Sequence, residues 1–313
     1  MMINWIFLRD TCLLLLYTLT SCLALIGNGL VCRLSFQQKS STNLPFSTSR
    51  IFLLNLAIAD TLSGLTILLQ FLFCSKSLLD YFPLSSHLCI LTKSLQILAY
   101  NTSTWTICVI AFDRYRRIED PLQQHYHRHT RRSIAFTWIL SGLFASSCLM
   151  SMRVHTYFIS RDKLISCQVF FPHIFSDSIR KIRVFCLMIF FYLIPLIILT
   201  VLCILTMRIL ARRSIIGVQQ FPKFRQSRTR SIRLLTVIVT VFALSHLPVH
   251  ILHLRDFFIR SSSKSNKCND TTIYLLFYWL SISSCCHNPL LYSWFNRQFQ
   301  LLVIHCVRTV FCR

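Results

Sequence analysis

Length, composition and charge indicate an integral membrane protein and exclude an ordinary soluble domain. The chain has 313 residues, of which 54% are hydrophobic and only 14% are charged, and its mean hydropathy is positive. A formal net charge of +23 would favour nucleic-acid binding in a soluble protein. Here Lys and Arg lie in short stretches between apolar spans, where they set orientation and meet anionic lipid. We therefore expect membrane lipid, and no nucleic acid, as a partner.

Seven apolar stretches are each long enough to cross a hydrocarbon layer of about 30 Å as a helix. The first is longer than the apolar core of a signal peptide, so we expect an uncleaved helix. Basic residues around the loops at 37–49 and 125–132 place those loops in the cytoplasm. The sequence thus predicts an extracellular N-terminus at 1–10, a helical domain at 11–300 and a cytoplasmic tail at 301–313. The expected spans are 11–34, 51–74, 89–114, 133–152, 184–209, 232–258 and one that ends near 292.

Two polar residues inside these spans predict interior contacts. Asn28 is costly in a membrane unless it bonds to a neighbouring helix, so it should face the bundle. Asp60 lies at mid-membrane, where a carboxylate marks a functional interior site by default. The alternative is a neutral, protonated Asp60 that is hydrogen-bonded within the core.

The connecting segments carry their own signals. Residues 164–171 alternate between apolar and polar side chains, which predicts a β-hairpin in the loop between the fourth and fifth spans. The sequence Asn269-Asp270-Thr271 makes Asn269 a candidate glycosylation site. Residues 295–302 predict a short amphipathic eighth helix on the inner leaflet, followed by candidate palmitoylation sites at Cys306 and Cys312. The expected fold is an all-α membrane protein, a seven-transmembrane helix bundle with that eighth helix.

The third span carries the most specific motif. It opens on Cys89 and ends in Asp113-Arg114-Tyr115, followed by Ile118 and Pro121-Leu122. This pattern resembles the third helix and second inner loop of rhodopsin-like (class A) G-protein-coupled receptors. Each of the seven spans carries one residue that matches the class A pattern, in order and with family-like separations. These residues are Asn28, Asp60, Arg114, Trp138, Pro195, Pro248 and Pro289.

The resemblance implies a receptor that binds an extracellular ligand at the plasma membrane and activates a heterotrimeric G protein, with no enzymatic step. It also implies a disulfide between Cys89 and Cys167 and a sodium ion held by Asp60, Ser103, Ser284 and Asn288. In the closed state Arg114 would pair with Asp113. The residues implied in activation and coupling are Asp113, Arg114, Tyr115, Pro195, Phe242, His246, Pro248, Asn288, Pro289 and Tyr292.

Only a few positions of the sequence indicate the class of ligand. Gln96 stands where receptors for amines carry an aspartate, so a simple amine would lack its counter-ion. Together with 278–281 and 288–292, it resembles receptors of the neuropeptide Y, neuropeptide FF and tachykinin groups, and we expect a peptide ligand. A lipid or nucleotide, held by basic outer residues such as Arg153, is the alternative. Candidate ligand contacts are Gln96, Tyr100, Phe170, His250, His253 and Asp256, although the two histidines could equally serve packing.

Three positions depart from the class A pattern. His246 replaces the tryptophan that senses ligand, Cys203 replaces a tyrosine of the fifth helix, and Thr104 replaces a branched apolar residue. These departures leave a second function open, in which a weakly coupling protein of receptor fold acts as a decoy or as a partner in a heteromer.

Overall fold

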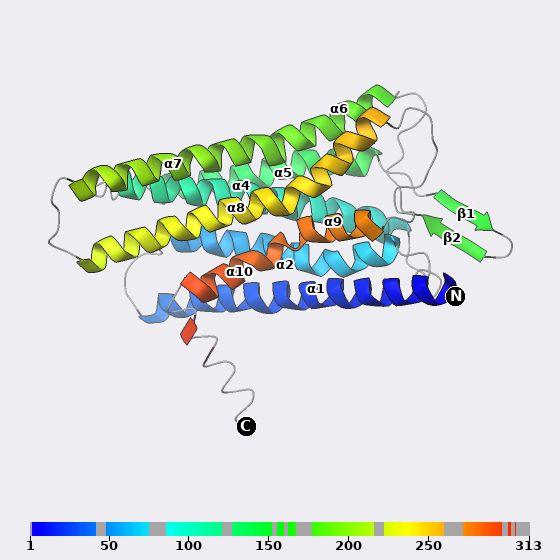
Figure 1. Ribbon diagram of the computed structural model, residues 1–313, viewed down its shortest axis with the longest axis horizontal. Coiled ribbons are helices and arrows are strands. Elements are labelled where there is room, and N and C mark those ends of the chain that lie inside the picture. Colours follow the sequence, from blue (N-terminus) through cyan, green and yellow to red (C-terminus); the bar gives the residue numbers. More distant parts are fainter. Residues whose placement is uncertain are drawn as a thin grey trace.

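The computed structural model describes residues 2–41, 48–74, 86–120, 127–151, 155–159, 162–166, 177–215, 222–259, 272–295, 300–301 and 304. Long helices lie side by side along one axis and form a single bundle (Figure 1). In chain order they are α1 (Met2–Ser41), α2 (Thr48–Cys74), α4 (Ser86–Glu119), α5 (His127–Ser151), α6 (Asp177–Met188), the π-helix η1 (Ile189–Leu193), α7 (Ile194–Ile215), α8 (Pro222–Ile259), α9 (Thr272–Ile282) and α10 (Ser284–Phe295).

The predicted spans correspond to these helices. Within the described residues, five helices are long and apolar enough to cross a membrane, and the one in the fifth predicted span combines α6, η1 and α7. The fourth predicted span is α5, and the seventh is α9 and α10, separated by Ser283. The first helix begins at Met2, well before the predicted start at Thr11, so residues expected to form an extracellular terminus are helical.

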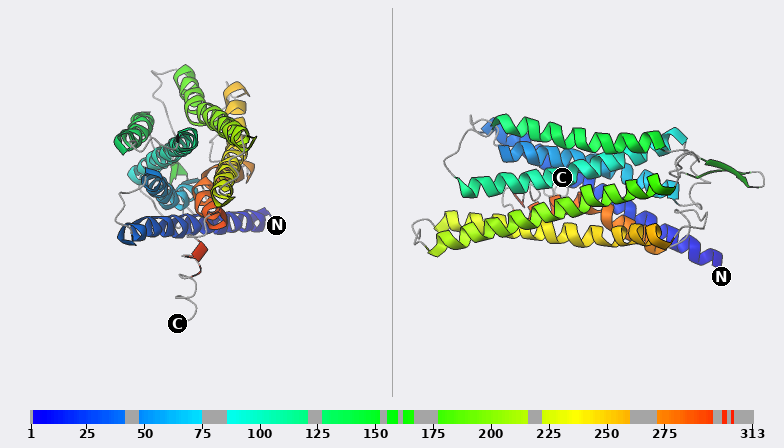
Figure 2. Two further views of the ribbon diagram at one scale, coloured as in Figure 1. Left: turned by 90° about the vertical axis from the view of Figure 1, so that its left-hand side faces the viewer. Right: turned by 90° about the horizontal axis from the view of Figure 1, so that it is seen from above.

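A two-stranded hairpin caps one end of the bundle. Strand β1 (His155–Ile159) pairs antiparallel with β2 (Asp162–Ser166), with His155 opposite Ser166 and Ile159 opposite Asp162. The predicted hairpin is thus confirmed in kind, although it begins earlier than the alternating stretch suggested. The start of α1 lies at this same end, called the hairpin end here (Figure 2). The opposite end, which carries the C-terminal part of α4, is called the Arg114 end.

The bundle is apolar outside and partly polar inside, as expected for helices in lipid. Leu15 and Leu143 are each 65% exposed, whereas Asn28, Asp60 and Asn101 are each only 1% exposed. Exposed leucines of this kind need no partner in a membrane, because hydrocarbon solvates them. The buried polar groups mark where helices bond to one another.

Small residues allow α1 to approach its neighbours closely. A Cβ on Gly64 of α2 would lie 2.9 Å from the Cβ of Ala24. Beside this contact, Ser21 Oγ donates to the carbonyl of Gly64 at 2.7 Å, and Asn28 Nδ2 donates to the carbonyl of Cys285 in α10 at 3.0 Å. The predicted bundle-facing position of Asn28 is therefore confirmed. These contacts fix α1 against α2 and α10.

Candidate functional site

Asp60 lines a small cavity between α2, α4, α8 and α10. Ser103 Oγ donates to Asp60 Oδ1 at 2.7 Å, and Asn288 Nδ2 donates to Asp60 Oδ2 at 2.8 Å. The cavity volume is about 20 Å³, enough for one water molecule or one small ion. Ser284 lines the same cavity, so the structure brings together all four residues of the predicted cation set.

The cavity has an aromatic side formed by Tyr100, Phe242 and His246. The His246 ring stacks on Tyr100 with a centroid distance of 5.1 Å and lies 4.5 Å from the Phe242 ring. Ser245 Oγ lies 2.8 Å from His246 Nδ1 and 3.3 Å from the carbonyl of Phe242, so it forms hydrogen bonds with both groups. Within the part of the chain that the structure describes, His246 Nε2 and the Tyr100 hydroxyl are buried without a hydrogen-bond partner. A water molecule in the cavity could bond to both groups.

A second aromatic group continues from this cavity along α8. Tyr192 of η1 stacks on His250 with a centroid distance of 4.5 Å, and its hydroxyl donates to the carbonyl of Ala243 at 3.2 Å. His253 follows, with its ring centroid 6.3 Å from that of His250. Tyr192 was missed by the sequence analysis, because it lies in an apolar run and only the nearby Pro195 hinted at irregular helix geometry.

The side-chain amide of Gln96 links two helices, α4 and α2. It is buried, its Nε2 donates to Ser63 Oγ at 2.8 Å, and its Oε1 accepts from the Thr66 hydroxyl. Both polar atoms of the amide thus hold α4 to α2. The predicted ligand contact of Gln96 stays a prediction, but this residue also has a structural task that the sequence did not reveal.

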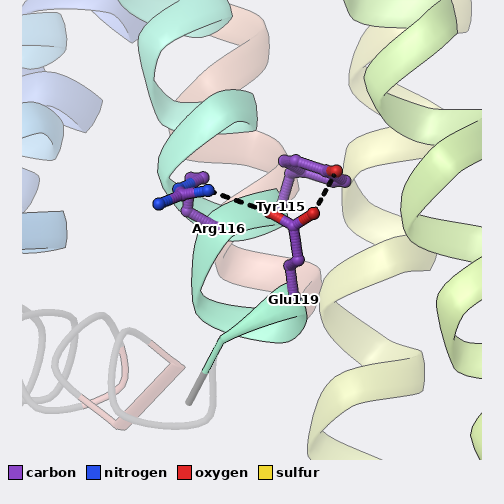
Figure 3. Close-up of polar contacts among 3 residues, drawn as sticks. All are labelled: Tyr115, Arg116 and Glu119. Atoms are coloured by element: carbon purple, nitrogen blue, oxygen red, sulfur yellow. Dashed lines mark hydrogen bonds and ion pairs between the residues drawn. The ribbon is translucent and has the colours of Figure 1, made fainter. Parts of the chain in front are cut away.

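The Arg114 end carries a network of charged residues on α4. Arg117 Nε donates to Asp113 Oδ2 at 2.9 Å, and Asp113 is buried. Glu119 accepts from the Tyr115 hydroxyl at 2.7 Å and from Arg116 at 3.1 Å, so one carboxylate joins two side chains of the preceding turn (Figure 3). The structure therefore gives Asp113 a partner in Arg117, whereas the predicted pair of Asp113 with Arg114 stays a prediction.

The other two departures from the class A pattern are accommodated by local hydrogen bonds. Cys203 Sγ of α7 lies 3.3 Å from Thr236 Oγ of α8. Thr104 Oγ1 donates to the carbonyl of Tyr100, one turn earlier in α4, at 3.0 Å. Pro195 is buried, and its carbonyl lies 3.9 Å from Cys108 Sγ of α4. The side chains of Cys203 and Thr104 therefore both have hydrogen-bond partners within the bundle.

Several predicted residues lie outside the part of the chain that the structure describes. Cys89 is disulfide-bonded, but its predicted partner Cys167 lies outside the described residues, so the pairing itself stays a prediction. The side chains of Asp256 in α8 and Tyr292 in α10 are also outside it. The remaining predicted residues outside the described part are Phe170, Asn269, Cys306 and Cys312.

Comparison with known proteins gives a consistent result. Residues 27–292 match the model of the 7 transmembrane receptor (rhodopsin family). The chain is 28% identical over 300 residues to the tachykinin-like peptides receptor 86C of Drosophila melanogaster, covering 92% of this chain and 56% of that protein. It is 29% identical over 303 residues to somatostatin receptor type 4 of Rattus norvegicus, covering 93% and 72%. It is 25% identical over 304 residues to neuropeptide FF receptor 1 of Rattus norvegicus, covering 91% and 67%.

Proposed function

Because the chain belongs to the rhodopsin family of seven-transmembrane receptors, we propose that it binds an extracellular peptide and activates a heterotrimeric G protein. The single observation that carries the ligand class is that the reported relatives are receptors for tachykinin-like peptides, somatostatin and neuropeptide FF. The proposal places the chain in the plasma membrane, with the hairpin end outside and the Arg114 end in the cytoplasm.

The geometry around Gln96 supports a peptide over a simple amine. An amine needs a carboxylate partner, and Gln96, at the position in question, has both amide atoms engaged by Ser63 and Thr66. Further toward the hairpin end, His250 and His253 face the interior region around Tyr192. A peptide can bond to these imidazoles through its backbone and side chains, because each ring offers hydrogen-bonding nitrogens.

The mechanism is a population shift between a closed and an open arrangement at the Arg114 end. We take the described arrangement as the closed one, in which Leu234, Leu235 and Ile238 of α8 are buried in one apolar cluster with Leu202 and Cys203 of α7. A peptide that binds the open arrangement better moves the equilibrium by its difference in affinity. The G protein then binds the surface that α8 uncovers, which includes Arg114.

A sodium ion in the Asp60 cavity would favour the closed arrangement. The donors there suit a small hard cation, since they are a carboxylate and the hydroxyl oxygens of Ser103 and Ser284. These groups come from α2, α4 and α10, so an ion among them would hold three helices together. Asp60 is the one carboxylate among the residues that line the cavity, and a single carboxylate suits a monovalent cation, which is therefore the class proposed.

The decoy function is the second candidate, and His246 and Cys203 are the residues that favour it. Two contacts argue for signalling instead. The His246 ring keeps an aromatic contact with both Tyr100 and Phe242, and Cys203 keeps a contact with α8 through Thr236. The proposal therefore retains an active receptor.

A binding experiment tests the ligand class. Cells that display the receptor should bind at least one labelled peptide of the tachykinin, somatostatin or neuropeptide FF type, and an excess of the unlabelled peptide should displace it. Biogenic amines, lysophospholipids and nucleotides serve as the comparison panel. Saturable binding of one of these, with no binding of any peptide, would contradict the proposal.

A further inference from the structure

We propose that Tyr192 is a positioning residue that links the ligand-facing part of α8 to the part that moves when the bundle opens. The proposal rests on the proposed receptor function and adds a residue that this function did not include. Tyr192 contacts α8 on both sides of Pro248, the proline inside that helix. Its ring contacts His250 after the proline and Phe242 before it, and its hydroxyl contacts Ala243 before it.

Tyr192 lies in the π-helix η1, directly before α7, and the wider turn of this π-helix explains how its side chain meets α8. Pro195 has no N–H group, so the regular bond to the carbonyl four residues earlier cannot form. The chain accommodates this with a wider turn, in which Ile194 N–H bonds to the carbonyl of Ile189, five residues earlier. Such single π-turns reorient side chains and occur often at functional sites. Here Tyr192 lies in the π-turn and is only 5% exposed.

Tyr192 contacts residues of α8 that lie before and after Pro248. Its ring stacks on His250, which follows Pro248 toward the hairpin end, with an interplanar angle of 26°. Its hydroxyl donates to the carbonyl of Ala243, which precedes Pro248 toward the Arg114 end. A proline in a helix removes one backbone bond and makes that point easier to bend. The side chain of Tyr192 therefore spans the point where α8 would bend.

The hydroxyl contact stabilises the closed arrangement. Ala243 belongs to the same part of α8 as Leu235 and Ile238, which are buried in the closed bundle. Moving this part outward takes the Ala243 carbonyl away from α7 and breaks the bond. A neutral hydrogen bond of this kind changes an equilibrium constant by about two- to tenfold. A ligand that displaces the His250 ring would remove the ring stack that holds Tyr192 on the other side of Pro248.

The test uses Tyr192→Phe, which keeps the ring and removes only the hydroxyl. Tyr17→Phe is the matched control, because the Tyr17 hydroxyl is also buried and donates to a helix carbonyl at 2.9 Å, but to that of Leu275 in α9 and not to one in α8. Spin labels at the exposed positions Arg212 of α7 and Arg233 of α8 report the opening as a distance distribution in the full-length receptor. G-protein activation without ligand is measured in parallel, per receptor at the cell surface.

We expect Tyr192→Phe to raise the ratio of long to short distances, and the basal activity, by about two- to tenfold, while Tyr17→Phe leaves both unchanged. Tyr192→Leu, which removes the ring stack as well, should shift the distances at least as far. Unchanged distances in Tyr192→Phe, or an equal change in Tyr17→Phe, would overturn the proposal. A shift in distances with no G-protein activation by any variant would keep the role of Tyr192 and refute the proposed function instead.

Discussion

At the scale of single residues, a glycine lets α1 approach α10 closely. A Cβ on Gly27 would lie 2.6 Å from the Cβ of Pro289 in α10, closer than real Cβ atoms approach. A Cβ on Gly29, two residues further along, would have nothing within 4 Å of it. Gly27 therefore permits the helix approach that brings Asn28 to the carbonyl of Cys285.

This difference predicts opposite behaviour for two alanine substitutions. Gly27→Ala should push α10 away from α1 and lower the stability of the folded receptor by about 1–3 kcal/mol, the usual cost of overpacking. Gly29→Ala should have almost no effect. Thermal unfolding of the two purified variants in detergent measures both, and equal melting temperatures for the two would show that the contact is not tight.

Gln96 gives a second test at this scale. Gln96→Leu removes both amide atoms that bond to Ser63 and Thr66, and we expect a loss of about 1–3 kcal/mol because polar partners remain buried. Ser94→Ala is the control, since Ser94 bonds only to the carbonyl of Ile90 in its own helix among the contacts described. Melting temperatures measured without ligand decide the matter. If Gln96→Leu melts like Ser94→Ala, the amide serves the ligand and not the fold.

At the scale of helices and strands, the sequence predicted the elements better than their irregularities. The spans and the hairpin could be predicted because apolar length and alternation are local properties of the chain. The π-turn at Ile189–Leu193 and the break at Ser283 could not, because both depend on how a proline or a serine is accommodated by neighbouring helices.

The candidate site divides in the same way. Asp60 could be found because a carboxylate inside a membrane is costly, whereas Ser103 and Asn288 were expected from the resemblance to class A receptors. The roles of Tyr192 and Gln96 could not, because they depend on the rotation of each helix about its axis. Pattern matching places a residue on a helix, whereas packing decides which neighbour it meets.

The contact between α7 and α8 carries a prediction at the scale of these helices. Cys203 is 5% exposed and its Sγ lies 3.3 Å from Thr236 Oγ, so a tyrosine at this position does not fit the closed arrangement. Cys203→Tyr should therefore favour the open arrangement and raise basal G-protein activation several-fold, because overpacking costs about 1–3 kcal/mol in the closed state. Ile204→Tyr is the control, since Ile204 is exposed at the lipid-facing surface. Basal activity that is equal in the two variants would contradict this interpretation.

At the scale of the whole molecule, charge and polarity divide the bundle along its axis. Many of the 33 Lys and Arg residues fall in the segments 33–50, 113–133 and 208–233, beside few carboxylates. This asymmetry favours the cytoplasmic side for the Arg114 end by the positive-inside rule. Between the two ends, the Asp60 cavity is lined by α2 and α4 from the first half of the chain and by α8 and α10 from the second.

The cavity predicts that sodium acts on the whole bundle. Replacing choline by sodium at constant ionic strength should lower agonist affinity, because the proposed ion among α2, α4 and α10 would stabilise the closed arrangement. Asp60→Asn should remove this effect, since it removes the charge that holds the ion while keeping the shape of the side chain. Competition binding in membranes measures both variants. Equal sodium sensitivity in Asp60→Asn and the parent would place the ion elsewhere.

The most direct test of the central claim is peptide-stimulated nucleotide exchange on a G protein by the receptor reconstituted in lipid discs. Arg114→Ala is compared with Arg117→Ala, which removes a half-exposed partner of Asp113 and should cost little. The account predicts that at least one neuropeptide accelerates exchange by the parent and by Arg117→Ala, and that Arg114→Ala abolishes the response. A peptide response that survives in Arg114→Ala, or silence of the folded parent across the whole panel, would contradict it.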